Sequence, residues 1–336
     1  MKTILVTGGA GFIGSNFVCH FLEGNPDTRI INLDKLTYAG SLDNLIELQD
    51  DERHVFIQGD ICDKDLLNTI FTDYKVEGVI HFAAESHVDN SIDNPDAFIK
   101  TNITGTYTLL EVAKKFWMSA PFQYVSGKED SRFHHISTDE VYGSLGAEGF
   151  FSEATSYAPN SPYSASKAAS DFLVRSYFHT YGLNVITTNC TNNYGPKQHD
   201  EKLIPTVIRK ALAGEKIPIY GNGKNVRDWL FVKDHCKALE NVYKQGKLGD
   251  TYIIGGNNEL NNIHLATEIC HILDGLAPAE NSYKNQIGFV NDRPGHDFRY
   301  AVSIDKINSE LGWKPSEDFS RCLQETVQWY LKKYSV

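Results

Sequence analysis

The sequence predicts an α/β fold in which a doubly wound parallel sheet is joined to a smaller mixed α/β domain. Three observations support this. Short apolar runs alternate with helical patterns through the first half of the chain. Each run ends in small or polar residues, as strands do at the ligand-binding edge of an open parallel sheet. The alternation changes beyond residue 196. The apolar runs are residues 4–6, 29–33, 54–59, 77–82 and 132–137.

The change of rhythm predicts where the two domains meet. We expect residues 1–195 to form the nucleotide-binding sheet domain, with a return to it around 228–258, and residues 196–227 and 259–336 to form the smaller domain. In the second part, residues 216–220 are a predicted strand, and Gly221-Asn222-Gly223 is typical of a hairpin turn before a strand at 228–232. Helices are predicted at 263–273 and 320–334.

Composition limits the function classes. The 336 residues are 41% hydrophobic, enough for a large core, and the net charge of −11 disfavours a nucleic-acid or anionic-membrane surface. The six cysteines are scattered without close pairs or Cys/His clusters, so neither a disulfide framework nor a metal site is predicted. No apolar run is long enough to span a bilayer. We therefore expect a cytoplasmic protein.

A glycine-rich turn follows the first apolar run. Glycines at 8, 9, 11 and 14 precede a helical pattern over residues 12–22, which predicts a strand, a tight turn and a helix N-terminus. The free N–H groups of such a helix bind a pyrophosphate. A plain strand–helix turn would explain the glycines alone, but Asp34 ends the second apolar run, where an acid binds ribose hydroxyls and repels a 2′-phosphate. The pattern predicts a dinucleotide site that prefers NAD to NADP.

Other strand ends fit the same cofactor. The loop after Asp34 is expected beside the adenosine ribose, and Asp60 ends a third strand, where it would meet the adenine amine or cap the next helix. Ala83-Ala84 ends the fourth strand, and such small residues let a flat cofactor pass close to the backbone.

Tyr163 and Lys167 stand one helical turn apart, in a helix that Ser161 and Pro162 are predicted to open. An ammonium near a phenol favours the phenolate, so we expect Lys167 to lower the pKa of Tyr163 towards the working range. Tyr163 would then accept a proton from an alcohol, and Lys167 would also hold the nicotinamide ribose. A Tyr-x-x-x-Lys pattern is common by chance; its weight here comes from its place after the glycine turn and the strand ends.

The chain resembles the extended short-chain dehydrogenase/reductase superfamily in TGGAGFIG, Asp34, Asp60-Ile61 and YSASK at 163–167. The resemblance implies a Rossmann-type domain, bound NAD, a catalytic Tyr and Lys, and a homodimer built on helices beside the active site. The runs HFAAESHVDNSI, HHISTDEVYG, NCTNNYGPKQHDEKLIP, GNGKNVRDWLFVKDH and NDRPGHDFRYA are similar to those of superfamily members that dehydrate nucleotide-linked glucose. This implies dTDP-glucose as substrate, although the residues alone do not separate dTDP from UDP.

Thr138-Asp139-Glu140 distinguishes a dehydratase from its relatives. Removing water from a sugar needs one group to take the C5 proton and another to protonate the departing C6 hydroxyl, and two adjacent carboxyls can divide these tasks if their pKa values differ. The resemblance makes Glu140 the base and Asp139 the acid. The expected sequence is oxidation at C4 with hydride transfer to NAD⁺, elimination of water across C5 and C6, and return of the hydride to C6. The product would feed rhamnose or another deoxysugar.

The expected site residues fall into three groups. The catalytic group is Thr138, Asp139, Glu140, Tyr163 and Lys167. The expected cofactor-binding residues are Gly8, Gly11, Phe12, Ile13, Gly14, Asp34, Lys35, Leu36, Thr37, Asp60, Ile61, Phe82, Ala83, Ala84, Ser86, Thr101, Tyr163, Lys167 and Asn193. The substrate-binding residues that the resemblance implies are Ser86, Thr138, Asn192, Lys202, Leu203, Pro218, Ile219, Tyr220, Arg227, Asn262, Asp292, Arg293, Pro294, Gly295 and His296.

Two other functions fit part of the pattern. A nucleotide-sugar 4-epimerase or decarboxylase would share the cofactor, Tyr163 and Lys167, but would not require Asp139 and Glu140 together. A non-catalytic NAD(H)-sensing regulator should have lost the tyrosine or the lysine, and both are present. The loop from Lys197 to Asp200 lacks the aromatic residue that is usual in the family, and Thr191 and Phe298 also depart from the pattern. These departures leave the catalytic residues intact and put loop contacts in question.

Overall fold

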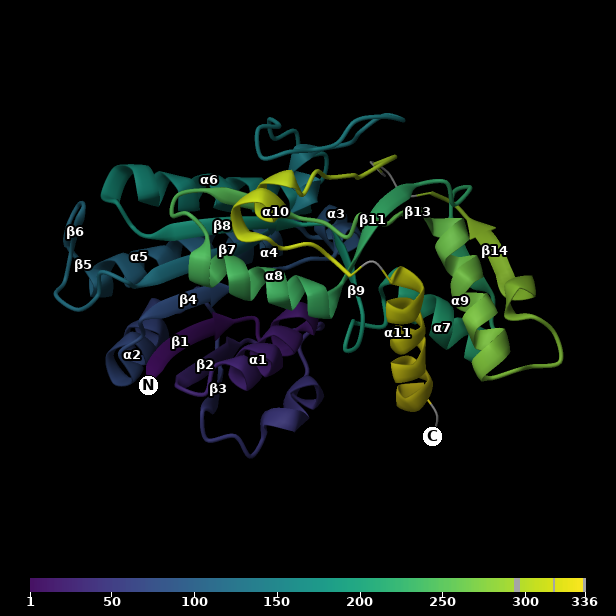
Figure 1. The fold of residues 1–336 in the computed structure, drawn as a ribbon, viewed down its shortest axis with the longest axis horizontal. Helices are drawn as coiled ribbons and strands as arrows, with labels where there is room; N and C mark the ends of the chain where they lie inside the picture. The colour runs from purple at the N-terminus through teal and green to yellow at the C-terminus, as the bar shows by residue number, and fades with distance from the viewer. Residues whose placement is uncertain (293–296, 317, 335–336) are drawn as a thin grey trace.

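The structure is a computed structural model that describes residues 1–292, 297–316 and 318–334. Its centre is a seven-stranded parallel sheet in the order β12-β8-β7-β4-β1-β2-β3 (Figure 1). Chain order reverses between β1 and β4, which is where open parallel sheets bind ligands. The predicted doubly wound sheet is confirmed. Its strands are β1 (Lys2–Thr7), β2 (Thr28–Asp34), β3 (His54–Gln58), β4 (Gly78–His81), β7 (Arg132–Thr138), β8 (Val185–Cys190) and β12 (Thr251–Ile254).

Helices cover both faces of this sheet because its strands are apolar on both sides. Apolar side chains of α1 (Phe12–Gly24), α8 (Val232–Gln245) and α10 (Asp305–Leu311) pack on one face. Those of α2 (Lys64–Tyr74), α5 (Thr106–Trp117) and α6 (Pro162–Tyr181) pack on the other. In Figure 1, α1 and α8 lie in front of the sheet. The two faces thus form two separate hydrophobic cores.

Short elements surround the carboxyl edge of the sheet. A π-helical turn, η2 (Ile99–Gly105), leads into α5, and a 3₁₀ turn, η3 (Asp139–Tyr142), follows β7 directly. The chain between α5 and β7 forms the small hairpin β5–β6 (Met118–Ala120 and Gln123–Tyr124). The remaining short elements are η1 (Leu42–Leu48), α3 (Val88–Asp93) and α4 (Pro95–Phe98).

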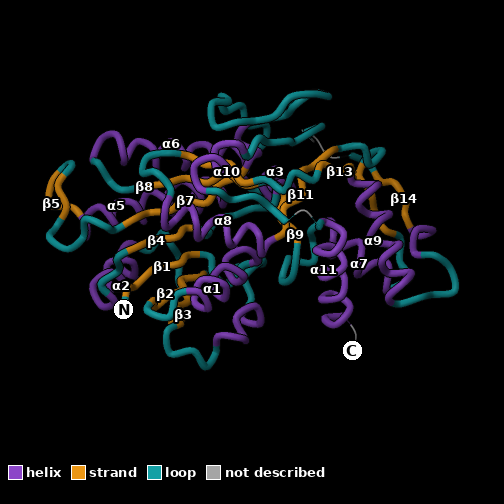
Figure 2. Tube along the Cα trace, in the orientation of Figure 1, coloured by secondary structure: helices purple, strands orange, loops and turns teal. Residues whose placement is uncertain are grey.

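A second cluster of elements lies beside the sheet, on the right in Figures 1 and 2. A three-stranded sheet joins β9 (Asn192–Tyr194), β11 (Val226–Phe231) and β13 (Glu259–Asn261), and β10 (Ile217–Tyr220) pairs with β14 (Ile287–Val290). Apolar side chains of these strands and of the helices named next form a third hydrophobic core. The other elements are α7 (Leu203–Leu212), α9 (Asn262–Leu276), η4 (Tyr283–Gln286) and α11 (Phe319–Tyr334).

The predicted hairpin at residues 221–223 is wrong. Gly221 and Gly223 both have positive φ, so the chain does turn there, but β10 and β11 separate into different sheets. β10 runs parallel to β14, with Tyr220 opposite Val290, whereas β11 pairs with β9 and β13. The apolar side chains of β10 are buried in the third core with α7 and α9, which outweighs a local pairing with β11.

The two-domain division stays a prediction. The expected return near 228–258 contains α8 and β12, which pack on the large sheet. α10, from the C-terminal part, also contacts β12 and α8. None of the described helices has the combination of length and apolar character that a bilayer span requires.

Candidate active site

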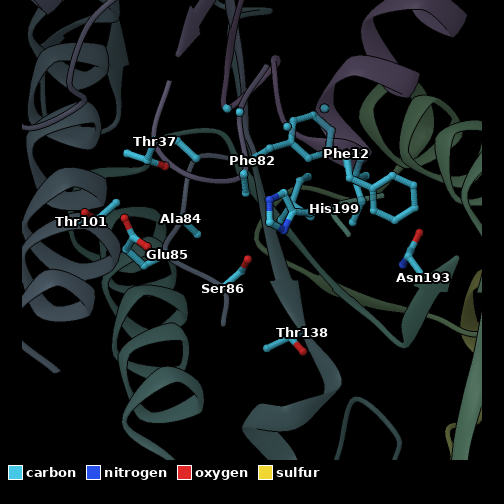
Figure 3. A pocket seen from close by; sticks show the side chains of 18 of the residues that line it. Phe12, Thr37, Phe82, Ala84, Glu85, Ser86, Thr101, Thr138, Asn193 and His199 are labelled. Carbon is cyan, nitrogen blue, oxygen red and sulfur yellow. The ribbon is translucent and has the colours of Figure 1, made fainter. Parts of the chain in front are cut away.

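One cavity opens at the carboxyl ends of β1, β2, β4 and β7 (Figure 3). All five expected catalytic residues line it. So do all of the expected cofactor-binding residues except Leu36. In Figure 3, Thr138 projects at the end of its strand, with Ala84, Ser86 and Thr101 across the cavity and Phe12, His199 and Asn193 on the other side. The fold therefore brings residues from eight segments of the chain, between residues 8 and 202, to one site.

The glycine turn has little room for side chains. A Cβ on Gly8, whose φ is +74°, would lie 2.6 Å from the nitrogen of Ala83, and one on Gly14 would lie 2.2 Å from the carbonyl oxygen of Gly8. A Cβ on Gly11 would meet only that same carbonyl, at 3.3 Å. No side chain caps the first turn of α1, so its N–H groups face the cavity edge without a side-chain acceptor. This cradle fits a pyrophosphate.

Asp34 is fixed at the end of β2. Its Oδ2 accepts a hydrogen bond from the backbone N–H of Ala10 at 2.9 Å, and its Oδ1 accepts one from Leu36 at 2.8 Å. Each carboxylate oxygen has a second lone pair, so the group can still accept from ribose hydroxyls. The neighbouring ammonium of Lys35 lies 2.9 Å from a carboxylate oxygen of Asp60, and this ion pair offsets a positive charge that would otherwise attract a 2′-phosphate. Both features fit NAD better than NADP.

α6 begins as predicted. The Ser161 side chain accepts a hydrogen bond from the N–H of Ser164, Ser164 completes the capping box, and Pro162 occupies the first turn. This start places Tyr163 and Lys167 on the face that borders the cavity, where they are 9% and 4% exposed. The ammonium of Lys167 donates to the carbonyl oxygen of Ile136 at 2.7 Å.

The expected lowering of the Tyr163 pKa is wrong for this arrangement. Burial, followed by the charge of Glu140, raises the pKa of the phenol well above its usual value, against a lowering hydrogen bond with Thr138. Burial also lowers the pKa of Lys167. Sequence spacing showed that the two groups share a helix face but could not show how little water reaches them.

Thr138, Asp139 and Glu140 form the turn that follows β7. The Thr138 hydroxyl caps η3 by accepting from the N–H of Glu140 at 3.3 Å, so threonine and not the acids serves as the cap. Asp139 is 1% exposed, and its Oδ2 has no hydrogen-bond partner among the described residues. Burial, then the charges of Glu140 and Asp228, raise the pKa of Asp139 well above its usual value. This environment favours the protonated form of Asp139.

The expected substrate-binding residues separate into two places. Ser86, Thr138, Asn192 and Lys202 line the cavity. Others lie in the second cluster of elements, where a Cβ on Gly221 would come within 2.8 Å of Asp292. Residues 293–296 lie outside the described residues. The expected substrate-binding residues that lie in the second cluster are Leu203, Pro218, Ile219, Tyr220, Arg227, Asn262 and Asp292.

Arg227 is buried within that cluster. Its guanidinium lies over the ring of Tyr300, 4.3 Å from the centroid, and donates to the carbonyl oxygens of Val226 and Asp297 at 2.7 and 3.0 Å. Its role as a diphosphate donor stays a prediction.

The sequence reasoning missed several cavity residues. Glu85, Gln198, His199 and Glu201 also line the cavity. Gln198 and His199 lie in the loop from Lys197 to Asp200, whose departure from the family pattern was noted, and Glu201 follows it directly. The sequence reasoning also missed Asn102, which joins the loop after β4 to α6. Its amide donates hydrogen bonds to the Glu85 carbonyl oxygen at 3.0 Å and to the Ser166 hydroxyl at 2.8 Å. The pairing of α6 with the loop after β4 leaves no local signal in the sequence. The described residues contain no group of His, Cys, Asp or Glu side chains arranged to hold a metal ion.

Comparisons with known proteins agree with this geometry. A family model described as GDP-mannose 4,6 dehydratase matches residues 5–326. A dTDP-glucose 4,6-dehydratase of Shigella flexneri is 54% identical over 337 residues, covering 98% of this chain and 92% of the relative. The chain belongs to the dTDP-glucose 4,6-dehydratase family.

Solved structures are similar across the whole fold. A dTDP-glucose 4,6-dehydratase from Bacillus anthracis, solved in complex with NAD, is 45% identical, with a TM-score of 0.87 and coverage of 99% of this chain and 98% of that one. A UDP-glucose 4-epimerase from Thermotoga maritima, solved with UDP-glucose, is 26% identical, with a TM-score of 0.85 and 99% coverage of both chains. The fold is thus shared between dehydratases and epimerases, and the site must distinguish them.

Proposed function

We propose that this chain catalyses the NAD-dependent dehydration of dTDP-glucose to dTDP-4-keto-6-deoxyglucose, a step in deoxysugar biosynthesis such as that of rhamnose. The observation that carries the proposal is the buried carboxyl of Asp139, whose pKa is raised, beside the half-buried Glu140 at one cavity wall. The relative from Shigella flexneri and the NAD complex from Bacillus anthracis support the substrate and the cofactor.

The cofactor fits the residues that are present. The glycine turn would hold its pyrophosphate, Asp34 the adenosine ribose, and Lys167 the nicotinamide ribose. NAD⁺ supplies a hydride acceptor and donor when bound, and brings a positive ring charge into the cavity. Asn193 has its amide oriented by His235, whose Nδ1 lies 2.8 Å from Oδ1 of Asn193, and it is proposed to contact the cofactor.

Tyr163 accepts the proton of the sugar 4-hydroxyl in this proposal. Burial raises the pKa of the phenol and keeps it protonated at rest, so it acts as a base only when positive charge is nearby. The buried Lys167, one helical turn away, is proposed to supply part of that charge. Thr138 keeps the tyrosine oxygen in place through their hydrogen bond.

Glu140 and Asp139 carry out the elimination. A ketone at C4 acidifies C5, and Glu140 takes the C5 proton. Asp139 delivers its proton to the departing C6 hydroxyl, which leaves as water. An environment that holds one carboxyl protonated beside a second one is how adjacent acids divide the acid and base roles. An epimerase has no use for this division.

A direct assay tests the proposal. The purified protein is incubated with dTDP-glucose and NAD⁺, and the alkali-induced absorbance of a 4-keto sugar is measured. We expect signal with the native chain and none with Tyr163→Phe. Formation of a C4 epimer without ketosugar would favour the epimerase, and NAD binding without any product would favour a sensing protein. The same assay with UDP-glucose tests the nucleotide, for which dTDP is proposed.

We also propose a homodimer in the cytoplasm. Large apolar side chains are exposed on adjoining η2, α5 and α6, where Ile99, Tyr107 and Phe172 are 53%, 47% and 58% exposed. Burial of this face against a second copy is expected to be disrupted by Phe172→Glu, as measured by sedimentation; a wild-type monomer at micromolar concentration would contradict the dimer. All six cysteines are free, which suits a reducing compartment, and cell fractionation tests that assignment.

A further inference from the structure

Asp171 is a buried carboxylate that the proposed reaction does not use. It lies in α6, one helical turn beyond Lys167, and is 4% exposed. Four groups contact it: His135 Nε2 at 3.0 Å, the Ser137 and Tyr157 hydroxyls at 2.9 Å each, and the Asn189 amide at 3.2 Å. Three of these contacts reach Oδ2 and one reaches Oδ1. Hydrogen bonds donated to a carboxyl group favour its charged form.

His135 contributes as a neutral donor. Burial, and then the charge of Lys167, lower its pKa, so the imidazole carries one proton at neutral pH. Asp171 accepts only, which assigns that proton to Nε2. The pair is therefore a neutral ring donating to a carboxylate, and Asp171 keeps its negative charge for other neighbours.

The contacts of Asp171 surround the carbonyl that Lys167 binds. Ile136 lies between His135 and Ser137, which both donate to Asp171, and its carbonyl accepts from the Lys167 ammonium at 2.7 Å. The Asn189 amide that contacts Asp171 also donates to the carbonyl of Thr138 at 3.1 Å. One side chain thus joins the helix that carries Tyr163 and Lys167 to the strand that ends in Thr138-Asp139-Glu140.

The charge of Asp171 also acts on Lys167. Burial lowers the pKa of the ammonium, and Asp171 is the foremost group that raises it, followed by Cys190. Burial raises the pKa of the Cys190 thiol to about 12, so it is neutral at pH 7. The facing imidazoles, His81 and His135, are neutral because burial lowers their pKa values. Asp171 is therefore the anion that balances Lys167 among these groups.

We propose that Asp171 is a positioning residue that keeps the buried Lys167 ammonium charged and fixes the end of β7 against α6. It touches neither the cavity nor a reacting atom; it acts through Lys167, Ile136 and Thr138. This inference rests on the proposed role of Lys167 at the nicotinamide ribose, and its test separates that role from the dehydration itself.

The test compares Asp171→Asn with the native chain in two measurements across pH 6–10. The first is NAD⁺ affinity by calorimetry, which needs no turnover. The second is the pH profile of kcat with dTDP-glucose. We expect the alkaline loss of NAD⁺ affinity, and the alkaline limb of kcat, to begin about 1 pH unit lower in the variant, the smallest shift expected when an opposite charge near an ammonium is removed. Asp171→Glu should restore part of the shift.

Tyr157→Phe is the matched control. It removes one of the four hydrogen bonds to Asp171 and leaves the carboxylate charge, so the affinity of the protein for NAD⁺ should keep its native pH dependence. The proposal would be overturned if NAD⁺ affinity and kcat of Asp171→Asn declined at the same alkaline pH as in the native chain. It would also be overturned if Tyr157→Phe shifted these pH profiles as much as Asp171→Asn does. A shift in NAD⁺ affinity in a protein that makes no ketosugar would support the role of Asp171 and reject only the dehydratase assignment.

A measurement on the native chain covers the case in which Asp171→Asn does not fold. The ¹³Cε chemical shift of labelled Lys167, assigned by comparison with Lys167→Met, reports its protonation directly. We expect the ammonium to persist through pH 8. Deprotonation below pH 7 would show that Asp171 does not maintain the charge, and would overturn the proposal.

Discussion

The Thr138 hydroxyl donates a hydrogen bond to Oδ1 of Asp139 at 3.4 Å, whereas Oδ2 of the same carboxyl has no partner among the described residues. Both oxygens are withdrawn from water, because the residue is 1% exposed. Burial and the charge of a second acid both favour the protonated form of a carboxyl group. This arrangement prepares Asp139 to act as an acid without a further partner.

Glu140→Gln should permit oxidation at C4 and block elimination. Glutamine cannot accept the C5 proton, while Tyr163 and Lys167 are unchanged. We expect kcat for ketosugar release to fall by roughly 10²- to 10⁴-fold, the usual contribution of a general base. Rapid mixing with dTDP-glucose should show NADH absorbance without product. Full turnover in this variant would remove Glu140 from the proposed role.

Asp139→Asn should slow elimination as well, but stabilise the fold at alkaline pH. The pKa of Asp139 is raised in the folded protein, so the folded state binds this proton more tightly than the unfolded chain does. The resulting stability is complete below the usual pKa of 3.8 and is lost as pH rises through the raised value. Asparagine does not titrate and avoids that loss.

Calorimetry checks the stability part of this prediction. We expect the Tm of Asp139→Asn to exceed that of the native chain at pH 9 by about 2–4 °C, the shift that 1 kcal/mol produces in a domain of roughly two hundred residues. The difference should shrink as pH falls to 5. Native-like Tm values across this range would show that Asp139 is ionised in the folded protein.

The sequence carried enough information for the sheet and its ligand edge, because apolar runs and the glycines report local periodicity and turn geometry. It did not carry the partner of β10: the run 217–220 pairs with 287–290, which is distant in the chain, and only the burial of Ile217 and Ile219 selects that pairing. The prediction of a hairpin at Gly221 was wrong because β10 pairs with this distant strand and not with β11. Local turn residues identify a turn but not the strands that it joins.

The meeting of the expected catalytic residues at one cavity was predictable for the same reason, whereas the electrostatics of these residues were not. Tyr163 and Lys167 share a helix face through their spacing alone. Their exposure depends on residues from other elements, and burial is what raises the pKa of Tyr163. The sequence spacing places Asp171 on the same helix face, one turn beyond Lys167. The four groups that donate hydrogen bonds to it come from other parts of the chain, which the spacing does not reveal.

A pair of glycine substitutions separates folding from cofactor binding. The Cβ of Gly14→Ala would lie 2.2 Å from the Gly8 carbonyl oxygen, so the backbone must shift, and we expect a loss of about 1–3 kcal/mol in the free energy of unfolding. The Cβ of Gly11→Ala meets the same atom at 3.3 Å and leaves folding nearly unchanged. It should still weaken NAD⁺ binding by about tenfold, or 1.4 kcal/mol, because the new methyl narrows the pyrophosphate cradle.

Chemical unfolding and calorimetric titration of both variants test this pair. A stable Gly14→Ala with native NAD⁺ affinity would show that the turn has more freedom than its contacts indicate. Native affinity in Gly11→Ala would place the pyrophosphate elsewhere.

The C-terminal helix should control how long the cofactor stays bound. Gln198, His199, Glu201 and Lys202 line the cavity, and Asp200 between them turns to α11, where it accepts from Lys333 at 2.8 Å and from the Tyr334 hydroxyl at 2.7 Å. Burial acts to raise the pKa of Asp200, but these hydrogen bonds outweigh it and lower the pKa overall. The helix thus anchors a loop that lines the proposed dinucleotide site.

The double variant Lys333→Met/Tyr334→Phe removes both contacts to Asp200. The ion pair is partly exposed, with side chains 40% and 37% accessible, so we expect a modest loss of about 1 kcal/mol and NADH dissociation roughly fivefold faster. Stopped-flow fluorescence of bound NADH measures this rate. Lys332→Met is the matched control, since Lys332 forms no ion pair with any described residue. Equal dissociation rates in the double variant and the native chain would mean that the loop keeps its place without α11, and that the contacts of His199 and Lys202 with the other cavity loops suffice.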